Sequence, residues 1–229
     1  MNIFLLGDVP NDLVSFTFFI GTMAMMAASV FFFLSLDAGG GKWRTSMLVS
    51  GLITFIAAVH YYYMRDANVS GADVTFFRYV DWILTVPLMC VEFYLILAKA
   101  GATKKLMWQL IGLSTVMLVA GYIGETGDSP VLYGTISGIA YFVMVGMLWL
   151  GSPKALAEKA GGSVLEAYNA LCWFILVGWS IYPIGYMIGT DGWYDFVDAI
   201  PLDMDVVYNI GDAINKIGFG LVIYNLAVS

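Results

Sequence analysis

The sequence predicts an all-α membrane protein, a bundle of seven transmembrane helices, and two observations carry that prediction. The chain is 60% hydrophobic and only 12% charged, whereas soluble domains have about 25% charged residues. Its apolar residues also gather into seven runs, each of the roughly 20 residues that a helix needs to cross a bilayer. The net charge of −7 argues against nucleic acid as a partner, because nucleic-acid binding requires a basic surface.

The seven apolar runs are separated by short, turn-like connections such as DAGGG and ETGDSP. In chain order the predicted spans cover residues 12–36, 43–64, 74–98, 104–125, 130–150, 163–188 and 204–228. No linker or change of composition divides them, so we expect a single domain over residues 1–229. The first residues, MNIFLLGDVPND, lack the cationic region and cleavage site of a signal peptide. The first span is therefore expected to act as its own insertion signal.

The charges in the connections predict how the bundle is oriented. The connections after the first, third and fifth spans are basic and contain Lys42, Arg44, Lys99, Lys104, Lys105, Lys154 and Lys159. The opposite connections have one cation, Arg65, which we interpret as a surface residue. They are otherwise acidic and contain Asp66, Asp73, Asp128, Asp191, Asp195, Asp198 and Asp203. Because positive residues mark the cytoplasmic side, the N-terminus is expected outside and the C-terminus in the cytoplasm.

The third span contains three ionisable residues, Arg78, Asp81 and Glu92. A charge at mid-membrane costs at least about 2.5–3.5 kcal/mol and therefore indicates a functional site. Asp81 is three residues from Arg78 and four from Thr85, so these side chains share a helix face. Glu92 returns to this face about 16 Å further along. One carboxylate in each half of the membrane is what directed proton movement requires, and the isolated Glu92 suits a proton donor.

The seventh span contains Asp212 and Lys216 one helical turn apart, in YNIGDAINKIGF. One interpretation is a pair of structural salt bridges, Arg78–Asp81 and Asp212–Lys216. That interpretation leaves Glu92 unpaired, and buried ion pairs seldom repay their desolvation. A buried lysine amine can also form a Schiff base with an aldehyde. If that Schiff base is protonated, the charges of the four residues sum to zero.

Three segments show a family resemblance: RYVDWILTVPL, GWSIYPIGY and YNIGDAINKIGFGLVIYN. They are similar to those of microbial (type 1) rhodopsins, in particular the proteorhodopsin and xanthorhodopsin branch, and the resemblance covers essentially the whole chain. It implies a light-driven outward proton pump of the plasma membrane, an ion transporter and not an enzyme. All-trans retinal would be bound to Lys216 as a protonated Schiff base.

The resemblance also assigns roles to the charged residues. Asp81 would be the counterion and proton acceptor, Asp212 the second counterion and Glu92 the cytoplasmic proton donor. Arg78 would organise the extracellular half, and the triplet Asp81, Thr85 and Glu92 resembles that of outward proton pumps. Alternatives from other classes are a photosensory rhodopsin that signals through a membrane partner, and a helix bundle without retinal.

His60 is the only histidine of the chain. A lone histidine in an apolar span is usually a packed, hydrogen-bonded residue. The resemblance instead matches it to a histidine that hydrogen-bonds the counterion Asp81 and tunes how that carboxylate accepts a proton. Histidine can titrate near neutral pH, which would suit a switch.

The resemblance further predicts an aromatic slot for retinal. The expected pocket residues are Trp82, Met89, Met117, Ser137, Tyr141, Trp179, Tyr182 and Pro183. Met89 stands where relatives that absorb green light carry Leu or Met, so green absorption is implied. We expect no metal site, and we expect the cysteines, Cys90 and Cys172, to be small buried residues.

Gly134 has two interpretations. Glycine in a membrane helix usually permits close helix packing. In xanthorhodopsin-like members, however, a glycine at the matching position opens a window against which a carotenoid antenna binds, so a hydroxylated carotenoid is a possible second chromophore. The lipid bilayer and protons are the other expected partners, and the family implies a homo-oligomer, a pentamer or hexamer.

Overall fold

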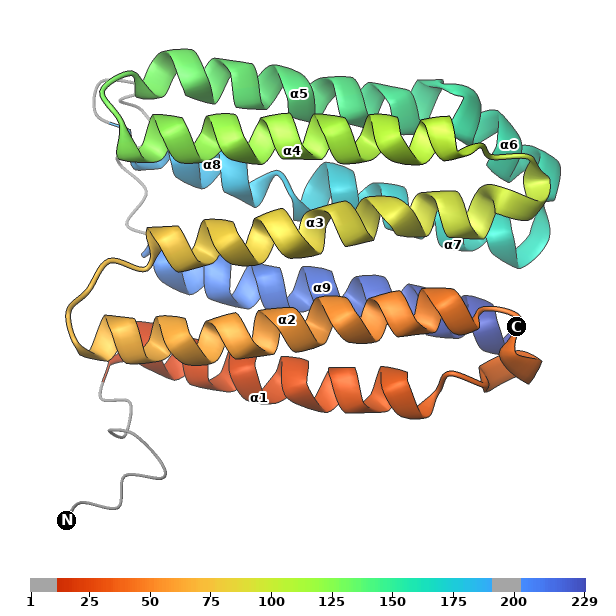
Figure 1. The fold of residues 1–229 in the computed structure, drawn as a ribbon, viewed down its shortest axis with the longest axis horizontal. Helices are drawn as coiled ribbons and strands as arrows, with labels where there is room; N and C mark the ends of the chain where they lie inside the picture. Colours follow the sequence, from red (N-terminus) through yellow and green to blue (C-terminus); the bar gives the residue numbers. More distant parts are fainter. Residues whose placement is uncertain (1–11, 191–202) are drawn as a thin grey trace.

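The computed structural model describes residues 12–190 and 203–229, and over these residues the chain is a bundle of helices (Figure 1). Seven of the helical stretches are long and apolar enough to cross a membrane. The long helices of the first five spans are α1 (Leu13–Leu34), α2 (Arg44–Val69), α3 (Thr75–Leu97), α4 (Lys104–Thr126) and α5 (Pro130–Leu150). The other described helices of the last spans are α6 (Ser152–Ala160), α7 (Gly162–Trp173), η3 (Phe174–Gly178), α8 (Ile181–Ile188) and α9 (Met204–Val228). Two short 3₁₀ turns, η1 (Ala38–Gly41) and η2 (Ala98–Ala100), lie in connections.

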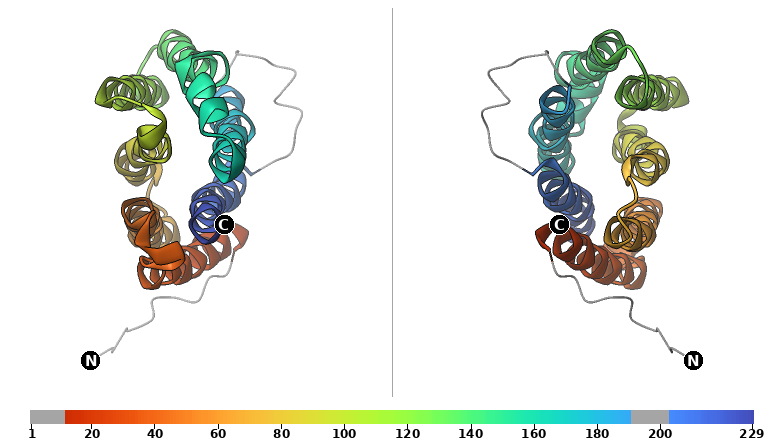
Figure 2. Two further views of the ribbon diagram at one scale, coloured as in Figure 1. Left: turned by 90° about the vertical axis from the view of Figure 1, so that its right-hand side faces the viewer. Right: turned by 90° about the vertical axis from the view of Figure 1, so that its left-hand side faces the viewer.

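The seven spans lie side by side in a closed ring, seen end-on in Figure 2. Each span contacts the next one in the chain, and α1 packs against α9 to close the ring. The predicted seven-helix membrane bundle is therefore confirmed. The acidic residues Asp191, Asp195 and Asp198, and residues 1–11 of the N-terminal segment discussed above, lie outside the described residues.

The ends of two spans and the interior of a third differ from the sequence prediction. The second helix continues five residues beyond the predicted end, to Val69. The fifth span is extended by α6, because the predicted loop SPKALAEKA begins with a proline in its first turn and continues with good helix formers. The sixth span is interrupted by η3, a π-helical segment, which hydrophobicity alone does not reveal.

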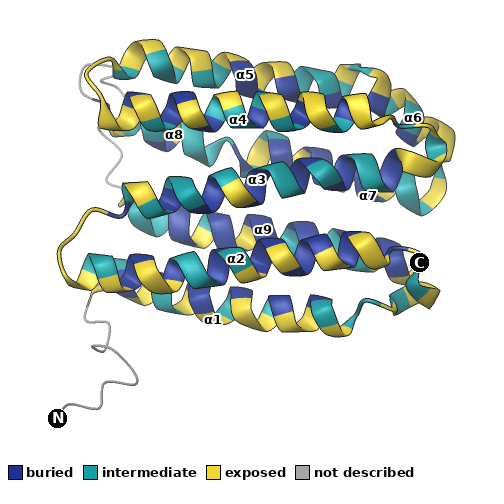
Figure 3. Cartoon of the chain, viewed as in Figure 1, coloured by how far each residue is buried: buried dark blue, intermediate teal, exposed yellow. Residues whose placement is uncertain are grey.

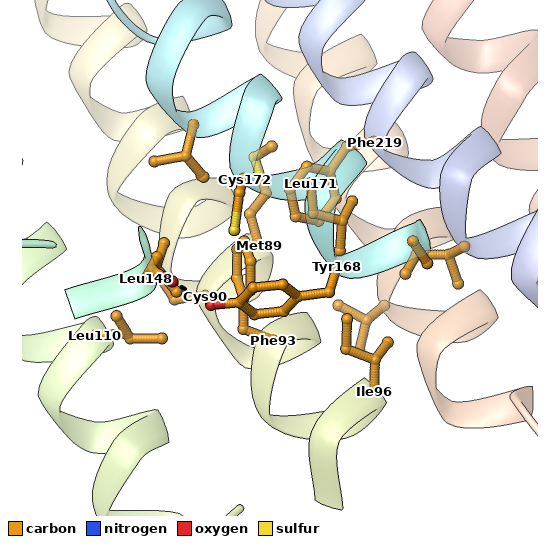
Figure 4. Packing of buried hydrophobic residues seen from close by; sticks show 14 of the residues in the cluster. Met89, Cys90, Phe93, Ile96, Leu110, Leu148, Tyr168, Leu171, Cys172 and Phe219 are labelled. Carbon is orange, nitrogen blue, oxygen red and sulfur yellow. Dashed lines mark hydrogen bonds between the residues drawn. The ribbon is translucent and has the colours of Figure 1, made fainter. Parts of the chain in front are cut away.

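Burial follows the ring, with buried stripes facing inward and exposed apolar residues facing outward (Figure 3). Leu34 and Leu150 are more than 80% exposed, a distribution that suits helices surrounded by lipid. Inside, a large apolar cluster joins α3, α7 and α9, and in it the ring of Phe93 contacts those of Tyr168 and Phe219 (Figure 4). Cys90 and Cys172 are both buried in this cluster as free cysteines, as predicted.

The prediction that Arg65 is a surface residue is wrong. Its side chain is only 8% exposed and pairs with Asp66 at 2.7 Å. The guanidinium also lies 5.0 Å from the ring centre of Tyr62. A cation near a helix end can thus be covered by its own neighbours along the chain.

Candidate functional site

The centre of the bundle contains Lys216 between two carboxylates. Lys216 and Asp212 are each 2% exposed and Asp81 is 0% exposed. The Lys216 Nζ donates to Asp212 Oδ2 at 2.6 Å and also to Asp81 Oδ2. The structure thus brings the predicted lysine and both predicted counterions together, from α9 and α3. Asp81 Oδ1 has no hydrogen-bond partner among the described residues.

Neighbouring side chains fix the two carboxylates differently. The Tyr182 hydroxyl, from α8, donates to Asp212 Oδ1 at 2.8 Å, so Asp212 is bonded through both of its oxygens. The Thr85 hydroxyl instead donates to the Asp81 backbone carbonyl at 2.9 Å. The Asp81 carboxylate is therefore held through Oδ2 only, whereas both oxygens of Asp212 are bonded.

Arg78 does not form the predicted alternative pair with Asp81. Its Nη1 bonds to Asp205 Oδ1 at 2.8 Å, and its side chain is 6% exposed whereas that of Asp205 is 39% exposed. The guanidinium also lies 5.0 Å from the ring centre of Tyr208. Sequence reasoning missed Asp205, although its position two helical turns before Asp212, on the same face of α9, could have indicated it.

Glu92 lies at the other end of the α3 face and is 0% exposed. Its polar contact is with Ser50, whose hydroxyl donates to Oε1 at 3.4 Å, while Oε2 has no partner in the described part of the chain. A buried carboxyl that lacks a cation is stable chiefly in its neutral form. This environment agrees with the isolated carboxyl that the sequence predicts.

His60 lies in α2 and is half-buried. Its Nδ1 donates to the Ile56 backbone carbonyl at 2.9 Å, and the structure shows no hydrogen bond between His60 and Asp81, both of which it describes. The packed-residue interpretation therefore accounts for the bond that the structure shows.

An apolar cavity of about 570 Å³ lies between α3, α4, α5, α8 and α9. Most of the predicted pocket residues line it: Trp82, Met117, Gly134, Ser137, Tyr141, Trp179, Tyr182 and Pro183. Met89 is not among the lining residues; it is 1% exposed and packs within the apolar cluster (Figure 4). Sequence reasoning missed other lining residues, among them Tyr79, Glu125, Gly121, Gly138 and Tyr208.

The cavity extends to the outer surface of the bundle between α5 and α8. Among its lining residues, Ile139 is 59% exposed and Phe142 is 66% exposed. Gly134 and Gly138 lie one turn apart in this wall, and a Cβ added at Gly138 would meet no atom within 4 Å. The space beside Gly138 is therefore open and is not filled by a neighbouring helix.

The ring of seven apolar helices and the lysine–dicarboxylate centre define a multi-pass membrane protein with a buried lysine paired to two carboxylates. Residues 12–229 match the family described as bacteriorhodopsin-like protein, and the chain belongs to that family. It is 45% identical to a blue-light absorbing proteorhodopsin of Gamma-proteobacterium Hot 75m4, covering 97% of this chain and 89% of the relative. A green-light absorbing proteorhodopsin of Gamma-proteobacterium EBAC31A08 is 43% identical, and the match covers 97% of this chain and 90% of the relative.

Solved structures agree with this assignment. The rhodopsin of Exiguobacterium sibiricum superposes with a TM-score of 0.82 at 29% identity, covering 94% of this chain and 96% of that one. Xanthorhodopsin, described as a light-driven ion pump with dual chromophore, superposes with a TM-score of 0.80 at 30% identity, covering 94% and 92%. The resemblance to the proteorhodopsin and xanthorhodopsin branch is therefore confirmed.

Proposed function

We propose that this protein is a light-driven outward proton pump that binds all-trans retinal covalently at Lys216. The observation that carries the proposal is the Lys216 amine held between Asp81 and Asp212 beside an apolar cavity. The proteorhodopsin relatives, which are named for light absorption, support it, as does the neighbour described as a light-driven ion pump.

The residues of the site fit retinal. The amine that would carry it is fully enclosed, and the adjacent cavity is walled by Trp82, Trp179 and Tyr141. Retinal bound to Nζ as a protonated Schiff base would supply light absorption and the isomerisation that drives the cycle. The two carboxylates would stabilise the positive charge on that nitrogen, as they stabilise the free ammonium.

The extracellular half would receive the proton. Asp81 Oδ2 contacts the Lys216 nitrogen and accepts its proton, whereas both oxygens of Asp212 are hydrogen-bonded, one of them to the Tyr182 hydroxyl. Arg78, paired with the partly exposed Asp205, organises the route from this centre to the surface. Protonation of Asp81 removes one negative charge beside the nitrogen, which favours transfer onward and not back.

The cytoplasmic half would restore the proton. Glu92 lies about 16 Å from Asp81 along α3 and, as a neutral carboxyl in apolar surroundings, holds a proton ready for the Lys216 nitrogen. Glu92 then takes a proton from the cytoplasm, so each cycle moves one proton outward. Moving this charge against 100 mV costs about 2.3 kcal/mol, which light must provide.

The test is illumination of cells that make the protein and are supplied with retinal. We expect the unbuffered medium to acidify in the light and the signal to disappear with a protonophore. Cells with the Lys216→Ala variant are the matched control and should give no signal. Alkalinisation would contradict the direction, and a slow photocycle without any pH change would favour a photosensor.

We also propose that a hydroxylated carotenoid binds beside Gly134, where the cavity reaches the outer surface. The open space at Gly138 and the neighbour described as having a dual chromophore support this. Adding the carotenoid to purified protein should add its structured absorption bands, and Gly134→Trp should remove them. Equal carotenoid uptake by Gly134→Trp would contradict the proposal.

We further propose a pentamer or hexamer in the plasma membrane, formed from the single domain of residues 1–229. The exposed apolar outer surface of the ring gives helices an area on which copies could pack. Native mass spectrometry from mild detergent should detect five or six copies. A monomer at all detergent ratios would contradict this proposal.

A further inference from the structure

The regular α-helix of the sixth span is interrupted immediately before Trp179, which lines the cavity. At this point the Trp179 amide donates to the Phe174 carbonyl, five residues back, at 3.0 Å. The next amides are also displaced, with Ser180 donating to Val177 and Tyr182 donating to Trp179. Three carbonyl oxygens thereby lose the amide partner that a regular helix would give them: those of Ile175, Leu176 and Gly178.

Side chains from two other helices form hydrogen bonds with these three carbonyl oxygens. The Tyr141 hydroxyl, from α5, lies 3.0 Å from the Ile175 oxygen and 2.8 Å from the Leu176 oxygen. The Asn215 Nδ2, from α9, donates to the Gly178 oxygen at 2.9 Å. Buried carbonyls must be paired, so the position of the break depends on these two side chains and not on the helix alone.

The contact between Asn215 and Gly178 is also sterically close. A Cβ added at Gly178 would lie 2.1 Å from Asn215 Oδ1, so a glycine is needed for the two helices to approach here. Asn215 is 4% exposed and directly precedes Lys216. Gly178 directly precedes Trp179. One hydrogen bond thus connects the residue before Lys216 to the residue before Trp179, which lines the cavity.

We propose that Asn215 is a positioning residue that couples movement at Lys216 to the break in the sixth span. While the bond to Gly178 is intact, α8 and Trp179 are held against α9. A displacement of α9 at Lys216 moves Asn215 and lengthens this bond. The Gly178 carbonyl then lacks its hydrogen-bond donor on α9, and α8 is free to shift relative to α7. The proposal rests on the proposed function, because light is what would move Lys216.

The first test is hydrogen–deuterium exchange of the purified protein, without retinal and with it. Asn215→Ala should increase exchange in peptides covering residues 174–184 by about fivefold, as expected for loss of one buried hydrogen bond. Asn225→Ala, an exposed asparagine on the same helix, is the matched control and should leave exchange there unchanged. Unchanged exchange in Asn215→Ala would overturn the proposal.

A second variant keeps the test decisive if Asn215→Ala does not fold. Gly178→Ala should displace the Asn215 side chain and increase exchange in the same peptides. If the two residues act through one bond, the Gly178→Ala/Asn215→Ala double variant should exchange no faster than the faster single variant. Additive increases would overturn the coupling.

Flash photolysis of the retinal-loaded variants separates this proposal from the proposed function. Asn215→Ala should keep a visible absorption band but change the rate of the later, reprotonation half of the cycle. A band with wild-type kinetics in every phase would contradict the coupling alone. Wild-type protein without a visible band would contradict the proposed function, while the exchange measurement without retinal would still report on the bond.

Discussion

At the scale of single residues, the centre of the protein is one cation between two anions. Lys216 bonds to Asp81 and Asp212, and all three are excluded from solvent. Removing one partner of a buried charge group leaves the others uncompensated, which costs about 3–5 kcal/mol. The same three side chains therefore determine both stability and the proposed chemistry.

Lys216→Ala is expected to abolish the visible absorption band formed with retinal, because Lys216 is the only buried lysine among the described residues. It should also lower the melting temperature, because two buried carboxylates lose their cation. Absorption spectroscopy and thermal unfolding measure these effects. Lys159→Ala, at an exposed lysine, should change neither, and a normal band in Lys216→Ala would contradict the attachment site.

Glu92→Gln is expected to slow reprotonation by at least tenfold, since general acid–base groups typically contribute about 10²–10⁴-fold. The amide keeps the shape and the contact with Ser50 but cannot supply a proton. Flash photolysis measures the rate, and added azide, a small diffusible acid, should restore it in part. Glu158→Gln, at an exposed carboxyl of α6, is the control. Unchanged kinetics in Glu92→Gln would remove Glu92 from this role.

At the scale of helices, close approach depends on glycine. A Cβ added at Gly220 of α9 would lie 2.4 Å from Phe32 Cζ of α1, and Phe32 is completely buried. The contact that closes the ring between the first and last spans therefore has no room for a methyl group. This requirement for glycine depends on which helices are neighbours. The sequence alone therefore does not show which of its glycines lie at such a close contact.

Gly220→Ala is expected to destabilise the bundle by about 1–3 kcal/mol through overpacking. Gly146→Ala is the matched control, because a Cβ there would meet no atom within 4 Å. Alanine favours a helix over glycine, so Gly146→Ala should be neutral or stabilising. Thermal unfolding in detergent compares the two, and equal melting temperatures would contradict the close approach.

Individual elements also show where prediction from sequence ends. Hydrophobic runs locate each span well because apolar length is a local property. The π-helical segment η3 was not predicted, because its exposed carbonyls are paired by Tyr141 and Asn215 from distant parts of the chain. The partner of Arg78 was missed for a similar reason, since Asp205 lies 127 residues away.

At the scale of the whole molecule, the basic connections lie at one end of the bundle and the acidic ones at the other. The α1–α2 and α3–α4 connections and α6 share one end, whereas the α2–α3 and α4–α5 connections share the opposite end (Figure 1). The positive-inside rule then favours a cytoplasmic basic end. The proposed outward direction of pumping depends on this orientation.

Single-cysteine labelling tests the orientation. Ser129→Cys, in the α4–α5 connection, should react with a membrane-impermeant maleimide on intact cells. Lys105→Cys, at the start of α4, should react only after the membrane is opened. The natural cysteines Cys90 and Cys172 are buried, so the wild type is the background control. The reverse labelling pattern would contradict the proposed orientation.

The sequence by itself determined the membrane class, the seven spans and the chemistry-bearing residues, because composition, apolar length and helical spacing are local properties. Asp81, Glu92, Asp212 and Lys216 are recognisable since charges inside apolar spans are costly and therefore few. Only the tertiary structure decided the partners that lie on other helices: Lys216 with Asp81, Arg78 with Asp205, and Asn215 with Gly178. These pairings depend on how helices distant in the chain face one another, and spacing within one helix does not contain that information.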